Sequence, residues 1–446
     1  MPAGDILTGY SFVPAEKNID NTKLNSIVGQ ASIQPAFISA QTESTSSTTG
    51  DYYLLLKAGG TLAKIMSDNV ASSLASSSGF QSQIWSTRLR SYNAVGNPNF
   101  EVDQRSVGNG TTIGTGGFAL DRWTCGRAAS TTIGGSLAQS PASIGGPVLP
   151  GTNFQVTNKI LRFTLTNAQA SLAAGDYVNI NNTIEGSSAR ELIADVSSVS
   201  IMARCSVAPI SFGLSLRDSP ITKSLVKLCT ISTANQWVVI SLPNIPVFPA
   251  GNFTMVPGSV GYILTIALAA GSTYMTPAND VWQTGNYTGA VGQSNFGAQA
   301  VNSTIDFAFV QHEPGPQCTT LIDCPFAGPN GSLEACQRYF QKTYSYPTAT
   351  GTANAVGYCG VIVPSYPLNY GTGQAFKKTM AKPPSVVIFN PATGASTSLY
   401  NGSTGTSQTV SAIGAVADSG FGYINTSANQ AVGNLLQFHY TADSGW

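Results

Sequence analysis

The sequence predicts a mainly β protein with an N-terminal region, a central antiparallel β-sandwich and a C-terminal β-domain that contains one short helix. Apolar residues alternate with polar or small ones in many segments, which is the period of strands with one buried face. Charged residues make up only 9% of the chain. This low content disfavours long surface helices, because such helices are stabilised by pairs of opposite charges. Clusters of Gly, Pro and Asn separate the alternating segments, as expected of turns.

The charges are balanced, with 21 basic and 21 acidic residues and a net charge of zero. The chain therefore lacks the positive stripe that neutralises phosphates, and we expect neither nucleic-acid binding nor attachment to an anionic membrane. A neutral, weakly charged surface also disperses a free monomer poorly. We expect an obligate oligomer whose subunits bury one another's surfaces.

The start of the chain, MPAGDILTGYSF, lacks the basic and apolar stretches of a signal peptide, which predicts folding in a cytosol. We expect no membrane insertion, because the most apolar segment, residues 260–270, is far shorter than the ~20 residues that span a bilayer. The 7 cysteines are odd in number and irregularly spaced, which suits buried free thiols in a reducing compartment.

The first 90 residues differ from the rest of the chain. A helix-like apolar pattern at residues 19–28 precedes a tract rich in Thr and Ser. Segments 51–57 and 58–65 then meet at Gly59-Gly60, a good two-residue turn, so we expect a β-hairpin followed by a short helix. This composition predicts a separate N-terminal region.

Residues 91–325 carry the clearest strand signal. Apolar residues alternate in at least five segments without helices between them, which predicts an antiparallel sandwich or jelly roll. The chain has no fixed-period repeat, which argues against a β-helix or a propeller. The alternating residues are Leu161, Phe163 and Leu165; Val199, Ile201 and Ala203; Phe212, Leu214 and Leu216; Tyr262, Leu264, Ile266 and Leu268; and Ile305, Phe307 and Phe309.

Residues 326–446 read as a compact β-domain. It begins with a predicted helix at 333–342, capped by Ser332. Strands such as 385–389 and 435–440 then alternate with turns rich in Gly, Ser and Thr.

Residues suited to catalysis or metal binding are sparse. Glycan hydrolysis needs two carboxylates that face each other; Glu101 and Asp103 share one phase of a predicted strand, but so does any such pair on a solvated strand. His439 is predicted to face solvent, and His312 to lie in a loop near buried thiols without metal-ligand spacing. The glycines at 108–117 read as loop glycines. We predict no enzymatic activity, no cofactor and no metal.

Aromatic and amide side chains gather late in the sandwich region, in a loop rich in Gly, Thr and Asn. Sugars present C–H faces that stack on Tyr and Trp rings while their hydroxyls bond polar neighbours, so such sites need no titratable group. The loop supplies glycan-binding candidates, and packing or a subunit interface is the other interpretation of these aromatics. The candidates are Tyr274, Trp282, Gln283, Asn286 and Tyr287.

Two segments resemble those of phage tail-fibre and head-fibre proteins. The first is N-P-N-F-E-V-D-Q-R at 97–105 with A-L-D-R-W at 119–123, and the second is L-E-A-C-Q-R-Y-F-Q-K at 333–342. The runs at 264–274 and 282–287 are similar to segments of the same fibres. The resemblance implies a virion-attachment region at 1–90, a jelly roll like that of carbohydrate-binding modules at 91–325, and a terminal β-domain at 326–446.

The D-R-W and C-Q-R-Y pieces of these segments contain no catalytic group, so we assign them structural roles. We expect a buried ion pair of Asp121 with Arg122 beside the Trp123 indole, because a buried charge needs a partner and a guanidinium can pack on a ring. The residues given structural roles are Gln104, Arg105, Asp121, Arg122, Trp123, Cys336 and Arg338.

The leading hypothesis is a homotrimeric fibre or spike of a bacteriophage virion, assembled in the host bacterial cytoplasm. Its N-terminal region would bind other virion proteins, and its sandwich and C-terminal β-domain would contact host-surface glycans. One alternative is a purely architectural head fibre, collar or adaptor protein without a ligand. Another is a depolymerising tailspike with an active site between subunits, since carboxylates distant in sequence can meet there.

Overall fold

The computed structural model describes residues 52–56, 62–66, 93–142, 147–148, 157–193, 195–250, 253–318, 331–364 and 369–446. The chain divides into two compact units, Met1–Gln81 and Ser82–Trp446. In the first unit, β1 (Tyr52–Leu56) and β2 (Leu62–Met66) pair antiparallel, as the hairpin prediction requires. The Gly59-Gly60 turn and the predicted N-terminal helices lie outside the described residues.

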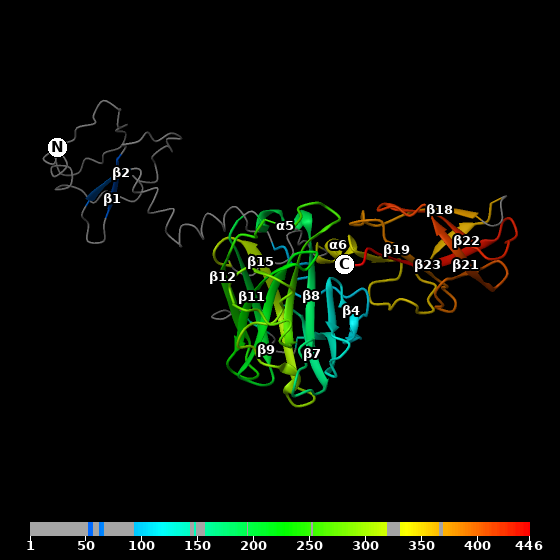
Figure 1. The fold of residues 1–446 in the computed structure, drawn as a ribbon. Helices are drawn as coiled ribbons and strands as arrows, with labels where there is room; N and C mark the ends of the chain where they lie inside the picture. The colour runs from blue at the N-terminus through cyan, green and yellow to red at the C-terminus, as the bar shows by residue number, and fades with distance from the viewer. Residues whose placement is uncertain are drawn as a thin grey trace, which may run out of the picture. The chain divides into compact units, whose positions relative to one another are not determined.

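The second unit begins with an antiparallel β-sandwich, which confirms the predicted mainly β fold (Figure 1). One sheet has seven strands in the order β14-β11-β10-β13-β8-β5-β4, and every neighbouring pair is antiparallel. Its strands are β4 (Thr115–Leu120), β5 (Trp123–Arg127), β8 (Tyr177–Glu185), β10 (Ile210–Arg217), β11 (Lys223–Ile231), β13 (Val260–Ala270) and β14 (Gln283–Thr284).

The facing sheet has six strands in the order β12-β9-β15-β7-β6-β3, again all antiparallel. Its strands are β3 (Thr111–Thr112), β6 (Gly134–Pro141), β7 (Lys159–Asn167), β9 (Ser197–Cys205), β12 (Val238–Ile245) and β15 (Thr304–Pro314). Gly116 and Gly117 lie in β4, so the prediction that they are loop glycines is wrong.

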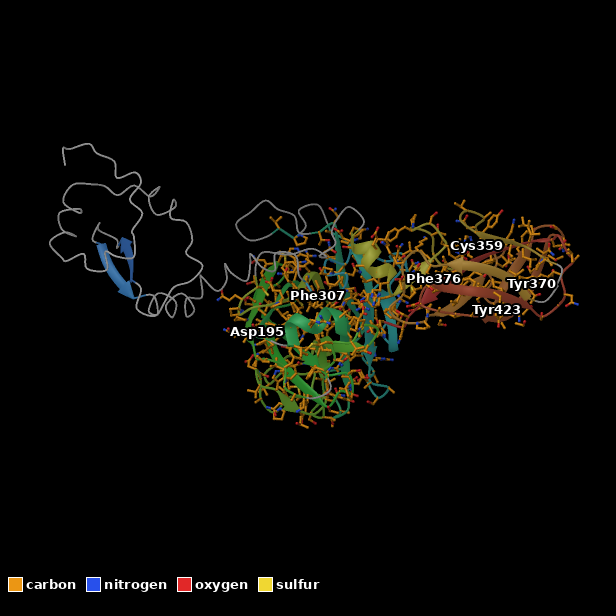
Figure 2. The ribbon with its side chains drawn as sticks, turned by 90° about the horizontal axis from the view of Figure 1, so that it is seen from above. Asp195, Phe307, Cys359, Tyr370, Phe376 and Tyr423 are labelled. Atoms are coloured by element: carbon orange, nitrogen blue, oxygen red, sulfur yellow. The ribbon has the colours of Figure 1, made fainter. Side chains whose placement is uncertain are left out.

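The core between the two sheets is built from the alternating apolar residues. Leu214, Leu216 and Phe212 of β10 face Phe307 of β15 across the interior, and the Phe212 and Phe307 rings meet edge to face at 5.8 Å. Figure 2 shows Phe307 within the sandwich. Because side chains point to opposite faces in turn, the period-two pattern buries one full row per strand.

A β-bulge changes the phase of β15. The pairing of β15 with β9 shifts between Phe307 and Phe309, so Phe307 and Val310 reach the main core. Phe309 instead packs on the outside of the six-stranded sheet, with Met202 and Ile160. The prediction that Phe309 shares a face with Ile305 and Phe307 is therefore wrong, because one inserted residue reverses every side chain that follows it.

Within the described residues, the sandwich carries an α-helix that the sequence did not predict. This helix, α5 (Gly186–Ile193), directly follows β8 and buries Ala189 and Leu192 in the main core. The described residues contain no helix that is long and apolar enough to cross a membrane.

The predicted helix at 333–342 is shorter than expected. The observed α6 spans Gly331–Gln337 and buries Cys336, and residues Phe340–Lys342 form strand β16. Pairing of β16 with the last strand of the chain outweighs the helical propensity of this segment. The predicted strand around Glu101 and Asp103 is also absent: the Asp103 carboxylate accepts hydrogen bonds from nearby backbone N–H groups and stabilises a turn.

The C-terminal strands form an antiparallel sheet in the order β16-β23-β20-β21-β22-β18, with β17 and β19 also pairing with β23. Its separate core includes Tyr370, Phe376 and Phe438; Figure 2 labels Tyr370 and Phe376 in this part of the chain. The remaining strands are β17 (Cys359–Ile362), β18 (Asn369–Ala375), β19 (Ser385–Phe389), β20 (Ser398–Asn401), β21 (Thr406–Gly414), β22 (Gly420–Thr426) and β23 (Leu435–Asp443).

Both histidines are buried, and the structure differs from each prediction: His439 does not face solvent, and His312 does not lie in a loop. His439 lies on β23 under the ring of Tyr344, at 3.9 Å between ring centroids, because neighbouring segments cover both faces of this strand. His312 lies in β15 rather than in a loop, and its ring nitrogens bond Tyr262 Oη and Ser197 Oγ. Burial lowers the pKa of His312 to about 3, so it is neutral at physiological pH.

A buried carboxylate joins the sandwich to the C-terminal β-domain. Glu185, at the end of β8, accepts two hydrogen bonds from Arg338, at 2.8 and 2.6 Å, and one from Tyr339 Oη at 2.6 Å. The Gly258 N–H donates a fourth, at 2.8 Å. The ring of Trp446, the last residue, stacks on Tyr339, so the chain ends beside this joint (Figure 1).

Arg105 makes a second connection between the same two parts. Its guanidinium lies between the rings of Phe118 and Phe340, 3.6 and 4.3 Å from their centroids, and forms a two-bond ion pair with Asp443 of β23. Gln104 beside it donates to the Phe340 carbonyl at 3.1 Å. The Q-R and C-Q-R-Y segments thus meet at one interface.

The expected ion pair between Asp121 and Arg122 does not form. Asp121 accepts hydrogen bonds from the backbone and the side chain of Gln104, while the Arg122 guanidinium stacks on the Tyr339 ring, 3.7 Å from its centroid. Arg122 has a positive φ of 72°, and its Nη2 donates to the Thr183 carbonyl rather than to Asp121. Trp123 is fully buried and donates to the Asn97 carbonyl instead.

We predict that Glu185→Gln destabilises the protein by about 2–3 kcal/mol at pH 7. Burial opposes ionisation of Glu185, but Arg338, Tyr339 and the Gly258 N–H outweigh it and hold the pKa at about 2. A depressed carboxyl pKa stabilises the folded state above the unfolded pKa of about 4.5, and this stabilisation is lost as the pH falls toward 2. Chemical denaturation between pH 7 and pH 2.5 measures the effect.

The matched control is Glu334→Gln, because Glu334 forms an exposed ion pair with Lys378. We expect a change near zero for this variant at every pH. Equal stability of Glu185→Gln and the wild type at pH 7 would contradict the proposed contribution of the joint.

Candidate functional site

The outward face of the seven-stranded sheet carries a compact polar patch. Asn179 and Asn181 of β8, Thr265 of β13, and Ser215 and Arg217 of β10 point away from the core; we refer to these five residues as the outer polar face. Strand register aligns them, because Asn181 pairs with Thr265 and Thr265 with Ser215. Four of the five are buried, and Asn181 is half-buried.

Arg217 is the only charged residue of the outer polar face. Its Nη2 donates to Thr265 Oγ1 at 2.7 Å and to Asn181 Oδ1 at 3.4 Å, and its Nη1 donates to Asn286 Oδ1 at 2.8 Å. Burial lowers the pKa of Arg217 to about 10, although Tyr177, Tyr274 and Asp218 oppose that shift. The guanidinium is therefore charged at neutral pH and is held by amide and hydroxyl oxygens.

Several buried polar atoms of the outer polar face have no hydrogen-bond partner among the described residues. They are Asn179 Oδ1, Ser215 Oγ and Arg217 Nε. The hydroxyl of Thr288, which lies in the loop formed by residues 271–294, also has no hydrogen-bond partner among the described residues. Leaving buried polar groups unpaired costs free energy, so a cluster of them on one sheet face is unusual and calls for a functional explanation.

Residues 271–294 pass over one side of this patch. A side chain at Gly213 of β10 would come within 2.5 Å of the Thr288 carbonyl, so glycine permits the loop to lie against the sheet. The loop carries Tyr274, whose ring meets Tyr177 of β8 edge to face at 5.0 Å. Both tyrosines are half-buried and form a rim beside the buried guanidinium of Arg217.

Three of the five sequence-predicted candidates lie around Arg217. Tyr274 belongs to the rim, Asn286 accepts a hydrogen bond from Arg217, and the backbone N–H of Tyr287 donates to Ser224 Oγ, next to Arg217 in the sheet register. Gln283 is half-buried in β14, where it also pairs with Ser224.

Trp282 lies apart from this group. Its ring packs against Phe248 and Phe253, at 4.9 and 5.3 Å between centroids, and its Nε1 donates to the Pro246 carbonyl. These contacts extend the main core, so packing accounts for this tryptophan.

The floor of the site was not predicted from the sequence; it consists of Arg217, Ser215, Thr265, Asn179 and Asn181. One signal was available, since β8 places Tyr, Asn, Asn, Thr and Glu at its outward positions, a row of groups suited to hydrogen bonding. No such signal exists for Arg217, which depends on the register between strands far apart in the sequence.

The described residues contain no group of three or more His, Cys, Asp or Glu side chains that could hold a metal ion. Among the described cysteines, Cys125, Cys205, Cys229 and Cys336 are buried, and Cys318 and Cys359 are half-buried. The side chains gathered around Arg217 are mainly amides, hydroxyls and phenols.

No protein-family model matches the chain, and no curated protein matches it. Solved structures show distant similarity. A CBM61 carbohydrate-binding module in complex with β-1,4-galactotriose is 12% identical, with 50% of this chain and 99% of that chain covered and a TM-score of 0.26. A family 11 carbohydrate-binding module of Clostridium thermocellum is 9% identical, with 45% and 91% covered and a TM-score of 0.21.

A viral protein is similar over the same share of the chain. The enzymatically active domain of tailspike protein 4 of bacteriophage CBA120 is 11% identical, covers 50% of this chain and 21% of its own, and has a TM-score of 0.23. Because the identities and TM-scores of all these structures are low, we base the function on this chain's own side chains.

We predict that Trp282→Ala acts through stability. Loss of its contacts with Phe248 and Phe253 should cost about 2 kcal/mol of unfolding free energy, less than for a fully buried ring. Denaturant unfolding measures the loss. Tyr358→Ala is the control, because Tyr358 is 38% exposed and its truncation should cost little; unchanged stability of Trp282→Ala would show that its ring does not support the fold.

Proposed function

We propose that this chain is a structural fibre or spike subunit of a bacteriophage virion, and that the outer polar face and its tyrosine rim bind a host-surface glycan. The observation that carries the glycan proposal is the buried Arg217 guanidinium, held by neutral oxygens beside Tyr177 and Tyr274. A charged donor can bond vicinal sugar hydroxyls, and phenol rings can pack on the C–H face of a pyranose.

The chemistry of this surface favours binding over cleavage. Glycoside hydrolysis generally uses two carboxyl groups about 5–10 Å apart across the scissile bond. The outer polar face offers amides and hydroxyls around one guanidinium. The buried Glu185 is engaged by Arg338 of the C-terminal β-domain, and the buried Asp121 is engaged by Gln104. We therefore propose a non-enzymatic role.

The phage assignment rests on the segments that resemble tail-fibre and head-fibre proteins. Two of them, at 97–105 and 333–342, meet in the interface formed by Arg105, Gln104 and Phe340. We propose that residues 1–90 attach the chain to other virion proteins, and that the sandwich at 91–325 and the β-domain at 326–446 project toward the host. Localisation in the virion and homotrimer formation belong to the same proposal.

Glycan-array screening of the purified chain tests the binding proposal. We expect selective, saturable binding of a neutral oligosaccharide, which calorimetry with that oligosaccharide then quantifies. Tyr274→Ala removes a rim ring and should weaken the affinity at least about tenfold, since a packed ring contributes on the order of 1 kcal/mol beyond the area that it buries. Tyr358→Ala, on the C-terminal β-domain, should bind like the wild type.

Three outcomes would count against this proposal. Absence of any saturable signal would favour an architectural spacer, and an unchanged affinity of Tyr274→Ala would move the site elsewhere. Release of shortened products from host polysaccharide would favour a depolymerising tailspike. A melting temperature measured for each variant separates lost binding from lost folding.

A second experiment tests assembly. A weakly charged surface is expected to be buried against other subunits, so native mass spectrometry of the full chain should give three times the chain mass. A stable monomer at micromolar concentration would contradict the trimer. A cryo-EM map of the virion with density for the sandwich would test the location independently.

A further inference from the structure

The opposite face of the sandwich carries a row of charges that the glycan proposal does not use. Arg162 of β7, Asp306 of β15 and Arg204 of β9 lie directly opposite one another on three neighbouring strands of the six-stranded sheet. All three point outward, because the adjacent residues Leu161, Phe163 and Ala203 belong to the core.

The two arginines share one carboxylate. Arg162 donates to both oxygens of Asp306, at 2.7 and 2.9 Å, and Arg204 donates twice to Oδ2, at 3.2 and 2.7 Å. Two positive charges therefore face one negative charge. Asp306 is buried, but the side chains of Arg162 and Arg204 are 35% and 25% exposed. Neither Nη1 group has a partner among the described residues, so each guanidinium keeps a free donor edge.

A small hollow lies beside this row. Its volume is about 90 Å³, and its walls include Arg162, Arg204, Trp237, Ile160 and Pro141. The Arg204 guanidinium lies 4.9 Å from the centroid of the Trp237 ring, which orients it. Ile160 belongs to the apolar cluster with Phe309 that the β15 bulge creates. The hollow thus combines free cationic donors with an aromatic and aliphatic wall.

We propose that this hollow binds the carboxylate of an acidic sugar, such as a uronic acid residue. The free Nη1 groups match the two oxygens of a carboxylate, and the surplus positive charge favours an anion over a neutral group. The hollow holds the volume of a few water molecules, which suits a carboxylate and its adjoining carbons. The sugar ring would then lie at the rim, against Trp237.

A purely structural ion-pair cluster is the competing interpretation. One guanidinium already satisfies both oxygens of Asp306, as Arg162 does, so neutralising Asp306 does not require Arg204. The second arginine supplies charge in excess of what folding needs, next to a hollow into which it can donate. The site is independent of the outer polar face, which lies on the other sheet.

NMR titration of the full chain with D-glucuronate, D-glucose and inorganic phosphate tests the proposal. We expect saturable shifts of the Trp237 indole signal with glucuronate, weakened at least about tenfold in Arg204→Gln and in Arg162→Gln. Each variant leaves Asp306 one arginine partner, so the fold should persist. Arg190→Gln is the charge-matched control, because Arg190 is exposed on α5. Tyr274→Ala should leave glucuronate binding unchanged, which separates this site from the proposed glycan site.

Equal binding of glucose and glucuronate would overturn the charge-based recognition, and equal binding of phosphate would reduce the site to a general anion site. Unchanged glucuronate affinity in both arginine variants, with folding verified by the melting temperature, would remove the site altogether. A titration with glucuronate that fails to shift the Trp237 signal would also refute the proposal.

Discussion

The buried carboxylate of Glu185 connects the two folded parts of the second unit of the chain. Four hydrogen bonds from Arg338, Tyr339 and Gly258 satisfy it, so its charge is stabilised in an apolar setting where an unpaired carboxylate would be very costly. Asn179 and Asn181 precede Glu185 at outward positions of the same strand, β8. One strand therefore presents the candidate site near its start and the joint at its end.

The fold class could be predicted because the strands bury the side chains at every second position. Leu161, Phe163 and Leu165 show this pattern in sequence and all three lie in the core. The prediction failed for Phe309, where a bulge shifts the phase without any local signal. It failed again at 340–342, because a strand partner about a hundred residues away overrides helical propensity. Both failures come from tertiary pairing, which a local pattern does not contain.

The candidate site shows the same division between local and non-local information. Tyr274 and Asn286 could be identified because aromatic and amide residues in a glycine-rich loop are suited to sugars. Arg217 could not, because its neighbours Thr265 and Asn181 come from strands that only the sheet topology brings together. Trp282, another of the candidates, packs on the main core, which is the alternative that the sequence left open for these aromatics.

The arginines on the two outward faces of the sandwich differ in burial and in their partners. On the seven-stranded sheet, Arg217 is buried and held by neutral oxygens, so it can direct donors without adding a strong field at the surface. On the six-stranded sheet, Arg162 and Arg204 remain partly exposed with one carboxylate between them, so their surplus charge reaches solvent. Only 9% of the residues of the chain are charged, so these arginines account for much of the difference in charge between the two faces. It favours neutral hydroxyls on one face and an anionic group on the other, which would let a single sandwich contact a polysaccharide that contains both.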